Sequence, residues 1–304
     1  MSSGDSSRPA SDRVWATLPA NAGSVLEEGL SPTDLQTLLL DLARTRSARV
    51  DAARLRQRWA EDRFVRPAEV DPRRLARLLA RAWSLLPAEF AGVELSPVTP
   101  LATCGAVGPV DQGWIVSTVR GSEVVSDPTN VLALEAARRR RSAPDDVHLA
   151  AHHRVLRAQR FGPGFSAHFA LLALVSSGRD GGSAVTELDF LRRHVSAWQT
   201  LLDDTLGPGG FLINYSTFGD RGLAERIADN LGPGLSELKP DEEPMPGGGY
   251  YAGLRFKIMA QTADGQLEIG DGGLTDWTAQ LTADAKERCL ISCVSTERWL
   301  GLLP

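Results

Sequence analysis

The chain has 304 residues, enough to bury one large hydrophobic core or two modest ones. Its apolar fraction of 42% and charged fraction of 23% are typical of folded globular proteins. A formal net charge of −5 argues against a protein that coats nucleic acid.

The cysteines and the N-terminus indicate the compartment. Three cysteines without a repeating pattern, Cys104, Cys289 and Cys293, give no disulfide framework and suit a reducing environment. The first residues, MSSGDSSRPASDR, lack the apolar centre of a signal peptide. No apolar run approaches the length of a membrane span. We therefore expect a soluble cytoplasmic protein that makes no contact with a membrane.

The N-terminal quarter is predicted to contain a tail followed by helices. Residues 1–23 are rich in Ser, Pro and Ala, which predicts a disordered tail. Residues 24–79 are predicted to form a helical segment, because Ser31 followed by Pro32 is a typical helix start and apolar residues then recur at helical spacing. Two further helices are expected, over about 51–62 and from Asp71 onward.

Arginines are concentrated in residues 42–81. Such runs usually form solvent-exposed helix faces, and we prefer that interpretation. Contact with RNA through these arginines is the alternative.

Residues 80–304 are predicted to form one strand-rich core. After Pro87 short β-like runs alternate with Gly and Pro. Asp127 or Thr129 can cap a helix that ends in the run Arg138–Arg141. A later helix over about 184–205 carries an apolar stripe, made of Leu188, Leu191, Val195, Trp198, Leu201 and Leu202. Helices first and strands later indicate an α+β fold with a largely antiparallel sheet.

A hairpin over 148–179 is the most informative stretch. Arg154, Arg157 and Arg160 precede the turn FGPGF, and Phe169 follows it. Guanidinium groups opposite an aromatic ring suit a nucleotide, since they offer forks for phosphate oxygens and a face for the base. The alternative is an ordinary hairpin with a charged edge.

Six segments, in order, carry a resemblance to a known family. They are ARAWSLLPAEFAGVELSPVTP (80–100), VVSDPTN (124–130), RVLRAQRFGPGFSAHF (154–169), GGGYYAGLRFKI (247–258), GDGGLTDWTAQL (270–281) and STERWLGLL (295–303). Together they resemble the class II aminoacyl-tRNA synthetase catalytic core, above all that of histidyl-tRNA synthetase and its shortened paralogues without an anticodon-binding domain. The first, third and sixth segments resemble the family's motifs 1, 2 and 3. This resemblance implies an antiparallel sheet flanked by helices, preceded here by a small helical segment.

The resemblance implies a role in ATP binding for five residues. Arg157 matches the motif 2 arginine at the α-phosphate, Arg160 approaches the phosphates, and Gln159 faces the adenine edge. Phe169 matches the aromatic residue under adenine. Arg298 matches the motif 3 arginine over the other face of the base. Arg157 and Arg298 would be the catalytic residues, and Mg²⁺ would accompany ATP.

The same resemblance implies a site for an amino acid or a related carboxylate. Asp127 and Thr129 match the residues that bind the amino group, and Tyr250 and Tyr251 match the side-chain pocket. If active, the chain would be an amino-acid-adenylating ligase that passes the acyl group to a non-tRNA acceptor such as a carrier protein. Segment 80–100 would form a homodimer.

Several departures favour a second hypothesis. Pro246 stands where the family has an arginine, Gln159 replaces an acidic residue, and SCVST (292–296) lacks the usual glycines, which narrows the space for adenine. In the GDGGLTDWTAQL turn only Asp271 or Asp276 is left as an equivalent of the family's polar residues. The chain stops after motif 3, so tRNA is not expected as a partner. The alternative is a catalytically silent paralogue that acts as a regulatory or scaffold subunit.

Three histidines, His148, His152 and His153, are close in sequence on a predicted strand. They have no Cys or carboxylate partner at metal-ligand spacing, so we predict strand-pairing and surface roles and no metal site.

Overall fold

The computed structural model describes residues 8–142, 145–162, 166–219, 221–231, 235, 237–241 and 249–304. Part of the FGPGF turn and Pro246 therefore lie outside the described residues. The chain forms two compact units. One contains residues up to Asp62 with Thr118–Gly121, and the other contains Arg63–Ser117 with Ser122–Pro304. The predicted segments 1–23, 24–79 and 80–304 stay predictions.

The first unit is helical. Its elements are α1 (Arg8–Trp15), α2 (Ala22–Ser24), the π-helical turn η1 (Val25–Gly29), α3 (Pro32–Ser47) and α4 (Ala52–Glu61). Helix α1 lies within the segment expected to be a disordered tail. The Ser31 Oγ accepts a hydrogen bond from Asp34 N at 3.1 Å, with Pro32 in the first turn, so α3 begins where the sequence predicts. No residue of α2, η1, α3 or α4 is buried.

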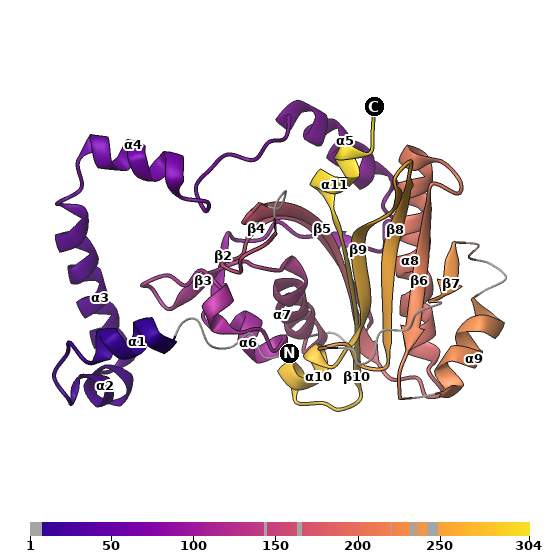
Figure 1. The fold of residues 1–304 in the computed structure, drawn as a ribbon. Coiled ribbons are helices and arrows are strands. Elements are labelled where there is room, and N and C mark those ends of the chain that lie inside the picture. Colours follow the sequence, from indigo (N-terminus) through magenta and orange to yellow (C-terminus); the bar gives the residue numbers. More distant parts are fainter. Residues whose placement is uncertain are drawn as a thin grey trace. The chain divides into compact units, whose positions relative to one another are not determined.

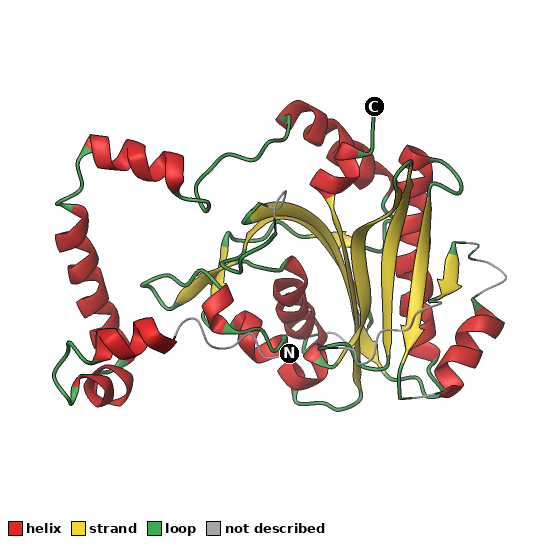
Figure 2. Cartoon of the chain, in the orientation of Figure 1, coloured by secondary structure: helices red, strands yellow, loops and turns green. Residues whose placement is uncertain are grey.

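The second unit is built on a large sheet. Its strands are β1 (Ala91–Gly92), β2 (Val98–Pro100), β3 (Ser122–Val124), β4 (Val147–Leu156), β5 (His168–Arg179), β6 (Phe211–Thr217), β7 (Leu238–Pro240), β8 (Leu254–Thr262), β9 (Gly265–Thr275) and β10 (Glu287–Ser295). Eight of them pair in the order β1-β4-β5-β10-β9-β8-β6-β7, and β2 pairs with β3 separately. Only the outer pairs β1–β4 and β6–β7 of this described sheet are parallel. The prediction of an α+β fold with a largely antiparallel sheet is confirmed (Figure 2).

Helices cover both faces of this sheet (Figure 1). They are α5 (Pro72–Leu85), α6 (Thr103–Val107), the 3₁₀ turn η2 (Gln112–Trp114), α7 (Pro128–Arg140), α8 (Val185–Leu206), α9 (Arg221–Asn230), α10 (Trp277–Thr282) and α11 (Thr296–Gly301). Side chains alternate along each strand, so each strand faces both layers. On β5, Leu172 and Leu174 join the core beneath α8, whereas Ala173 and Val175 join the core beneath α7. We call these sides the α8 face and the α7 face.

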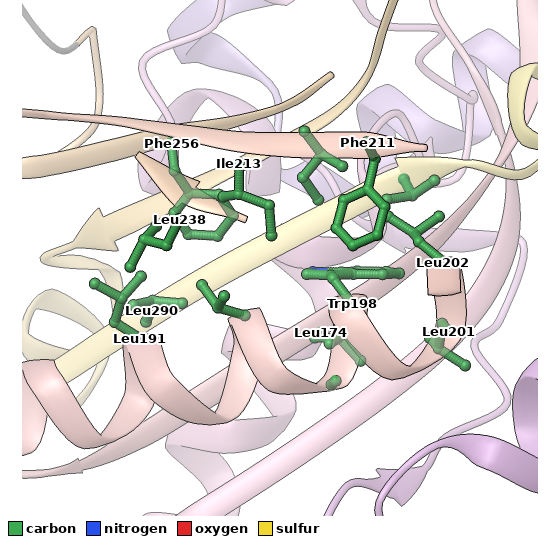
Figure 3. Packing of buried hydrophobic residues seen from close by; sticks show 14 of the residues in the cluster. Leu174, Leu191, Trp198, Leu201, Leu202, Phe211, Ile213, Leu238, Phe256 and Leu290 are labelled. Carbon is green, nitrogen blue, oxygen red and sulfur yellow. The ribbon is translucent and has the colours of Figure 1, made fainter. Parts of the chain in front are cut away.

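Helix α8 seals the α8 face. Its predicted apolar stripe is buried, and Trp198 has no exposed surface. Figure 3 shows the Trp198 ring lying beside Phe211 of β6, with Leu191 and Leu202 along the same side of the helix. No helix in the part of the chain that the structure describes has the length and apolarity needed to cross a bilayer.

Polar groups buried under α8 satisfy one another. The ring nitrogens of His194 contact the Oγ atoms of Ser292 at 2.8 Å and Ser176 at 2.9 Å. Ser292 also accepts from Trp198 Nε1 at 2.8 Å, and Ser176 contacts His148 Nδ1 at 2.7 Å. Because the side-chain polar atoms of this network have partners within it, the network holds α8 to the sheet in a fixed register.

The three neighbouring histidines do not converge. His148 and His152 lie on the α8 face, where His152 Nε2 contacts Thr296 Oγ1 at 3.2 Å. Strand alternation places His153 on the other face. Among the described residues, no group of three or more His, Cys, Asp or Glu side chains is placed to hold a metal ion.

The buried histidines predict acid sensitivity. Burial, aided by nearby His148, holds the pKa of His194 well below its usual range, and burial lowers the pKa of His152 to about 4. Below the unfolded-state histidine pKa of about 6.5, these histidines bind protons in the unfolded chain but stay neutral in the folded chain. Stability should therefore fall as the pH drops below about 6.5, and His194 should contribute to this loss.

Urea unfolding of the wild type and of His194→Gln between about pH 8 and about pH 5 measures this effect. We expect a smaller loss on acidification in His194→Gln, whatever its stability at neutral pH. An equal loss in both proteins would contradict the role given to His194.

Candidate functional site

Arg157 lies at the centre of the charged groups on the α7 face. It directly follows β4, and its main-chain N donates to Ala167 O at 2.8 Å, which continues the hairpin past the strand. Its Nε donates to Ser126 O at 2.9 Å, and its Nη2 lies 3.3 Å from Asp127 Oδ2. The Arg157 Cζ is 5.2 Å from the centre of the Phe169 ring. The hairpin thus brings together the arginine and the aromatic ring that the sequence singled out.

The other residues of the hairpin have different surroundings. Arg154 lies on the α8 face, where its Nη2 is 2.6 Å from Glu297 Oε1 and its Nη1 is 3.1 Å from His168 Nδ1. Arg160 is exposed and Gln159 is half-buried. The Gln159 carbonyl accepts from Arg63 Nη1 at 2.9 Å. Strand alternation therefore separates Arg154 from Arg157, although both precede the turn.

Asp127 and Thr129 are bonded to each other at the start of α7. The Asp127 Oδ1 accepts from Thr129 N at 3.0 Å and from Thr129 Oγ1 at 2.7 Å, which is an N-cap. Its Oδ2 faces Arg157. Asp127 is therefore the cap predicted from the sequence, and it also faces Arg157, whose guanidinium lies over the Phe169 ring.

Tyr250 and Tyr251 lie side by side near β9, with their ring planes tilted by 45°. Their ring centres are 4.6 Å apart, and Tyr250 lies 5.2 Å from the Trp277 ring. The Tyr251 hydroxyl donates to Asp271 Oδ2 at 2.9 Å. A Cβ on Gly273 would lie 2.6 Å from Tyr251 Cδ1, so this glycine makes room for the ring.

Electrostatic interactions indicate that these groups lie near one another. Burial first, and then Asp127 and Asp271, raises the pKa of the Tyr250 hydroxyl. Burial and the same two carboxylates raise the pKa of the Cys293 thiol, and Arg157 opposes that shift. Because both carboxylates act on both groups, they border one region. We call this region the α7-face site and define it by Asp127, Arg157, Phe169, Tyr250, Tyr251, Asp271 and Cys293.

Arg298 is tied to β9. Its Nη1 donates to Glu268 O at 2.7 Å, on the same strand as Asp271. Its main-chain N donates to Ser295 Oγ at 3.4 Å at the start of α11. The predicted pairing of Arg298 with Arg157 and Phe169 around a base stays a prediction.

The structure divides the SCVST segment between the two faces of the sheet. Ser292 lies on the α8 face and binds His194 and Trp198, so it does not narrow the α7-face site. Cys293, the next position on β10, points to the other face and borders the site, where its thiol lies 3.8 Å from Asp271 Oδ1. Cys293 is half-buried, whereas Cys104 and Cys289 are buried, and all three are free thiols.

The two aspartates of the GDGGLTDWTAQL segment have different surroundings. Asp276 is exposed at the start of α10, whereas Asp271 faces Tyr251 and Cys293. The sequence contains a signal for the position of Asp271. Residues 270–275 consist of three glycines, Leu274 and two polar residues, so the side chain of Asp271 has small neighbours on its strand. Arg63, which donates to the main chain of Ala158 and Gln159, left no signal in the sequence.

The N-cap predicts how α7 responds to mutation. Asp127→Ala removes the acceptor of two hydrogen bonds and should lower the free energy of unfolding by about 1–2 kcal/mol. Asp127→Asn keeps an oxygen that can accept from Thr129 N, so it should cost less than half as much. Urea unfolding of both variants measures the difference. Equal losses would show that the charge facing Arg157, rather than the cap, is the stabilising feature.

Comparison with known proteins gives the family of folds. No family model and no curated protein sequence matches the chain. Solved structures do match. An ATP phosphoribosyltransferase regulatory subunit/histidyl-tRNA synthetase from Bacillus halodurans is 13% identical, with 79% of this chain and 82% of that chain covered and a TM-score of 0.56.

Two further structures give similar values. For a histidine–tRNA ligase subunit from Alicyclobacillus acidocaldarius, the identity is 14%, the coverage is 77% of this chain and 96% of that chain, and the TM-score is 0.59. A histidyl-tRNA synthetase from Nostoc sp. is 12% identical over 79% of this chain and 74% of that chain, with a TM-score of 0.57. At such identities the similarity establishes the fold alone. The chain therefore has the class II aminoacyl-tRNA synthetase fold, in the form seen in histidyl-tRNA synthetases and their regulatory-subunit paralogues.

Proposed function

We propose that the α7-face site binds ATP together with an amino acid or a related small carboxylate. The observation that carries this proposal is the position of Arg157, which lies 5.2 Å from the Phe169 ring centre and 3.3 Å from Asp127 Oδ2. One cation thus stands between an aromatic surface and a carboxylate, and those two groups suit the two different substrates.

The nucleotide end consists of Phe169 and Arg157. Phe169 offers a half-buried ring face on which adenine can stack. The Arg157 guanidinium can form a charge-assisted, two-pronged contact with phosphate oxygens. Because the described residues offer no cluster of metal ligands, Mg²⁺ would be held mainly by the phosphate oxygens of ATP and by water.

The amino-acid end consists of Asp127 and the two tyrosines. Asp127 would pair with the α-ammonium group, and Tyr250 and Tyr251 would line the side-chain pocket. In the structure Asp127 faces Arg157. ATP that draws Arg157 to its α-phosphate would release Asp127 for the ammonium, so the two substrates would bind cooperatively.

This arrangement suits adenylate formation. A substrate carboxylate oxygen would attack the α-phosphorus while the bond to the pyrophosphate leaving group breaks, and Arg157 would stabilise the charge that develops on the phosphate oxygens. The acyl group would then pass to a non-tRNA acceptor such as a carrier protein or a small amine. The 80–100 segment, which contains the end of α5, β1 and β2, remains our proposed homodimer element.

A second function has its own support. The chain is similar to the ATP phosphoribosyltransferase regulatory subunit/histidyl-tRNA synthetase from Bacillus halodurans and covers 82% of that protein. It covers 74% of the Nostoc synthetase. Gln159 also stands where an acidic residue is expected, next to the motif 2 turn. A catalytically silent regulatory or scaffold subunit would bind the small molecules without forming an adenylate and would act through a protein partner.

Calorimetry with ATP and pyrophosphate exchange over the standard amino acids test these proposals. Arg157→Ala removes a charged phosphate contact and should weaken ATP binding about 10-fold or more. The matched control is Arg154→Ala, three residues away on the opposite face of the sheet, which should leave ATP binding unchanged.

The outcomes separate the two functions. Exchange with one amino acid supports the adenylating enzyme. ATP or amino-acid binding without any exchange supports the silent subunit. Absence of both exchange and binding would refute both proposals, and equal effects of the two arginine variants would refute the assignment of the site.

A further inference from the structure

Asp271 occupies the part of the α7-face site that is farthest along the sheet from the hairpin. It pairs with Cys293 on β10 and with Lys257 on β8, so it stands on an inner strand of the sheet. Its side chain is 28% exposed. Most of this carboxylate is therefore buried on an inner strand. Burial of a charge costs free energy unless partners compensate for it, so the partners of Asp271 are informative.

The described partners of Asp271 leave acceptor capacity unused. Its Oδ2 accepts from the Tyr251 hydroxyl at 2.9 Å and lies 3.8 Å from Arg255 Nη2. Its Oδ1 has the Cys293 thiol at 3.8 Å. Charge-assisted hydrogen bonds measure about 2.7–2.9 Å, and a carboxylate offers about four acceptor positions. One strong hydrogen bond and two long contacts therefore leave room for a cationic donor.

The charges around Asp271 also leave it incompletely compensated. Burial raises its pKa above the usual range, although the Tyr251 hydroxyl and Arg255 act in the opposite direction. Asp127 and Glu268 add to the rise. Burial is thus the main cost to the charged form of this carboxylate, and a cation that forms a close contact with it would offset that cost.

We infer that Asp271 makes the amino-acid end of the site selective for a substrate whose side chain carries an amine or guanidinium group. Asp127 would receive the α-ammonium and Asp271 the side-chain cation, so the two carboxylates recognise the two positive groups of one diamino acid or arginine-like molecule. This inference rests on the proposed binding of an amino acid at the same site.

Calorimetry in the presence of ATP compares cationic amino acids with neutral counterparts of similar shape. The pairs are lysine with norleucine and arginine with citrulline. We expect the wild type to bind the cationic member of at least one pair about 10-fold or more tightly than its neutral counterpart, as a buried charge-assisted contact predicts. Asp271→Asn should reduce this preference to about 3-fold or less and leave the neutral counterpart unaffected.

Asp276→Asn is the matched control, because Asp276 is an exposed aspartate just beyond the same strand. It should keep the full preference. Tighter or equal binding of the neutral members by the wild type would overturn the inference but support the proposed function, and this comparison does not depend on the folding of a variant. ATP binding without binding of any of the four amino acids would overturn the inference alone, whereas absence of both ATP and amino-acid binding would overturn the proposed function and the inference with it. Retained preference in a folded Asp271→Asn would also overturn the inference.

Discussion

The contact between Arg157 and Asp127 connects the two halves of the candidate site. Asp127 has one oxygen in the N-cap of α7 and the other facing the guanidinium that follows β4. The helix therefore fixes the carboxylate, and the carboxylate positions the arginine under which Phe169 lies. The Asp127 side chain thus joins the start of α7 to the end of β4, two segments that are far apart in the sequence.

The alternation of the sheet explains why the site has its composition. On the α8 face, the polar atoms of His194, Ser292 and Ser176 satisfy one another beneath a sealed helix. On the α7 face, the carboxylates of Asp127 and Asp271 and the guanidinium of Arg157 keep part of their surface exposed. A shift of one residue in the register of β10 would exchange Ser292 and Cys293, placing a hydroxyl in the site and a thiol in the network. The register therefore decides which chemistry each face carries.

Local patterns in the sequence predicted local structure well. Helical spacing identified the buried stripe of α8, and Asp127 before Pro128 identified the start of α7. Contacts that depend on the register were not predictable. Tyr251 and Asp271 meet because β8 and β9 pair as they do, and the SCVST segment could not be divided between faces without the position of each residue on β10. Arg63 donates hydrogen bonds to the main chain of Ala158 and Gln159, about 95 residues away. No pattern within either segment predicts these hydrogen bonds.

Two arginine–carboxylate pairs of this protein differ in how much free energy is needed to separate them. Arg140 and Glu287 are 5% and 6% exposed and lie 2.8 Å apart, so separating them would leave buried charges without compensation. Arg157 and Asp127 are 30% and 17% exposed and lie 3.3 Å apart. A longer, partly hydrated pair contributes about 1 kcal/mol or less, which a phosphate and an ammonium group can readily replace. The weak pair is thus suited to a binding site, because each of its members is held in place by neighbours and is released from the other at little cost.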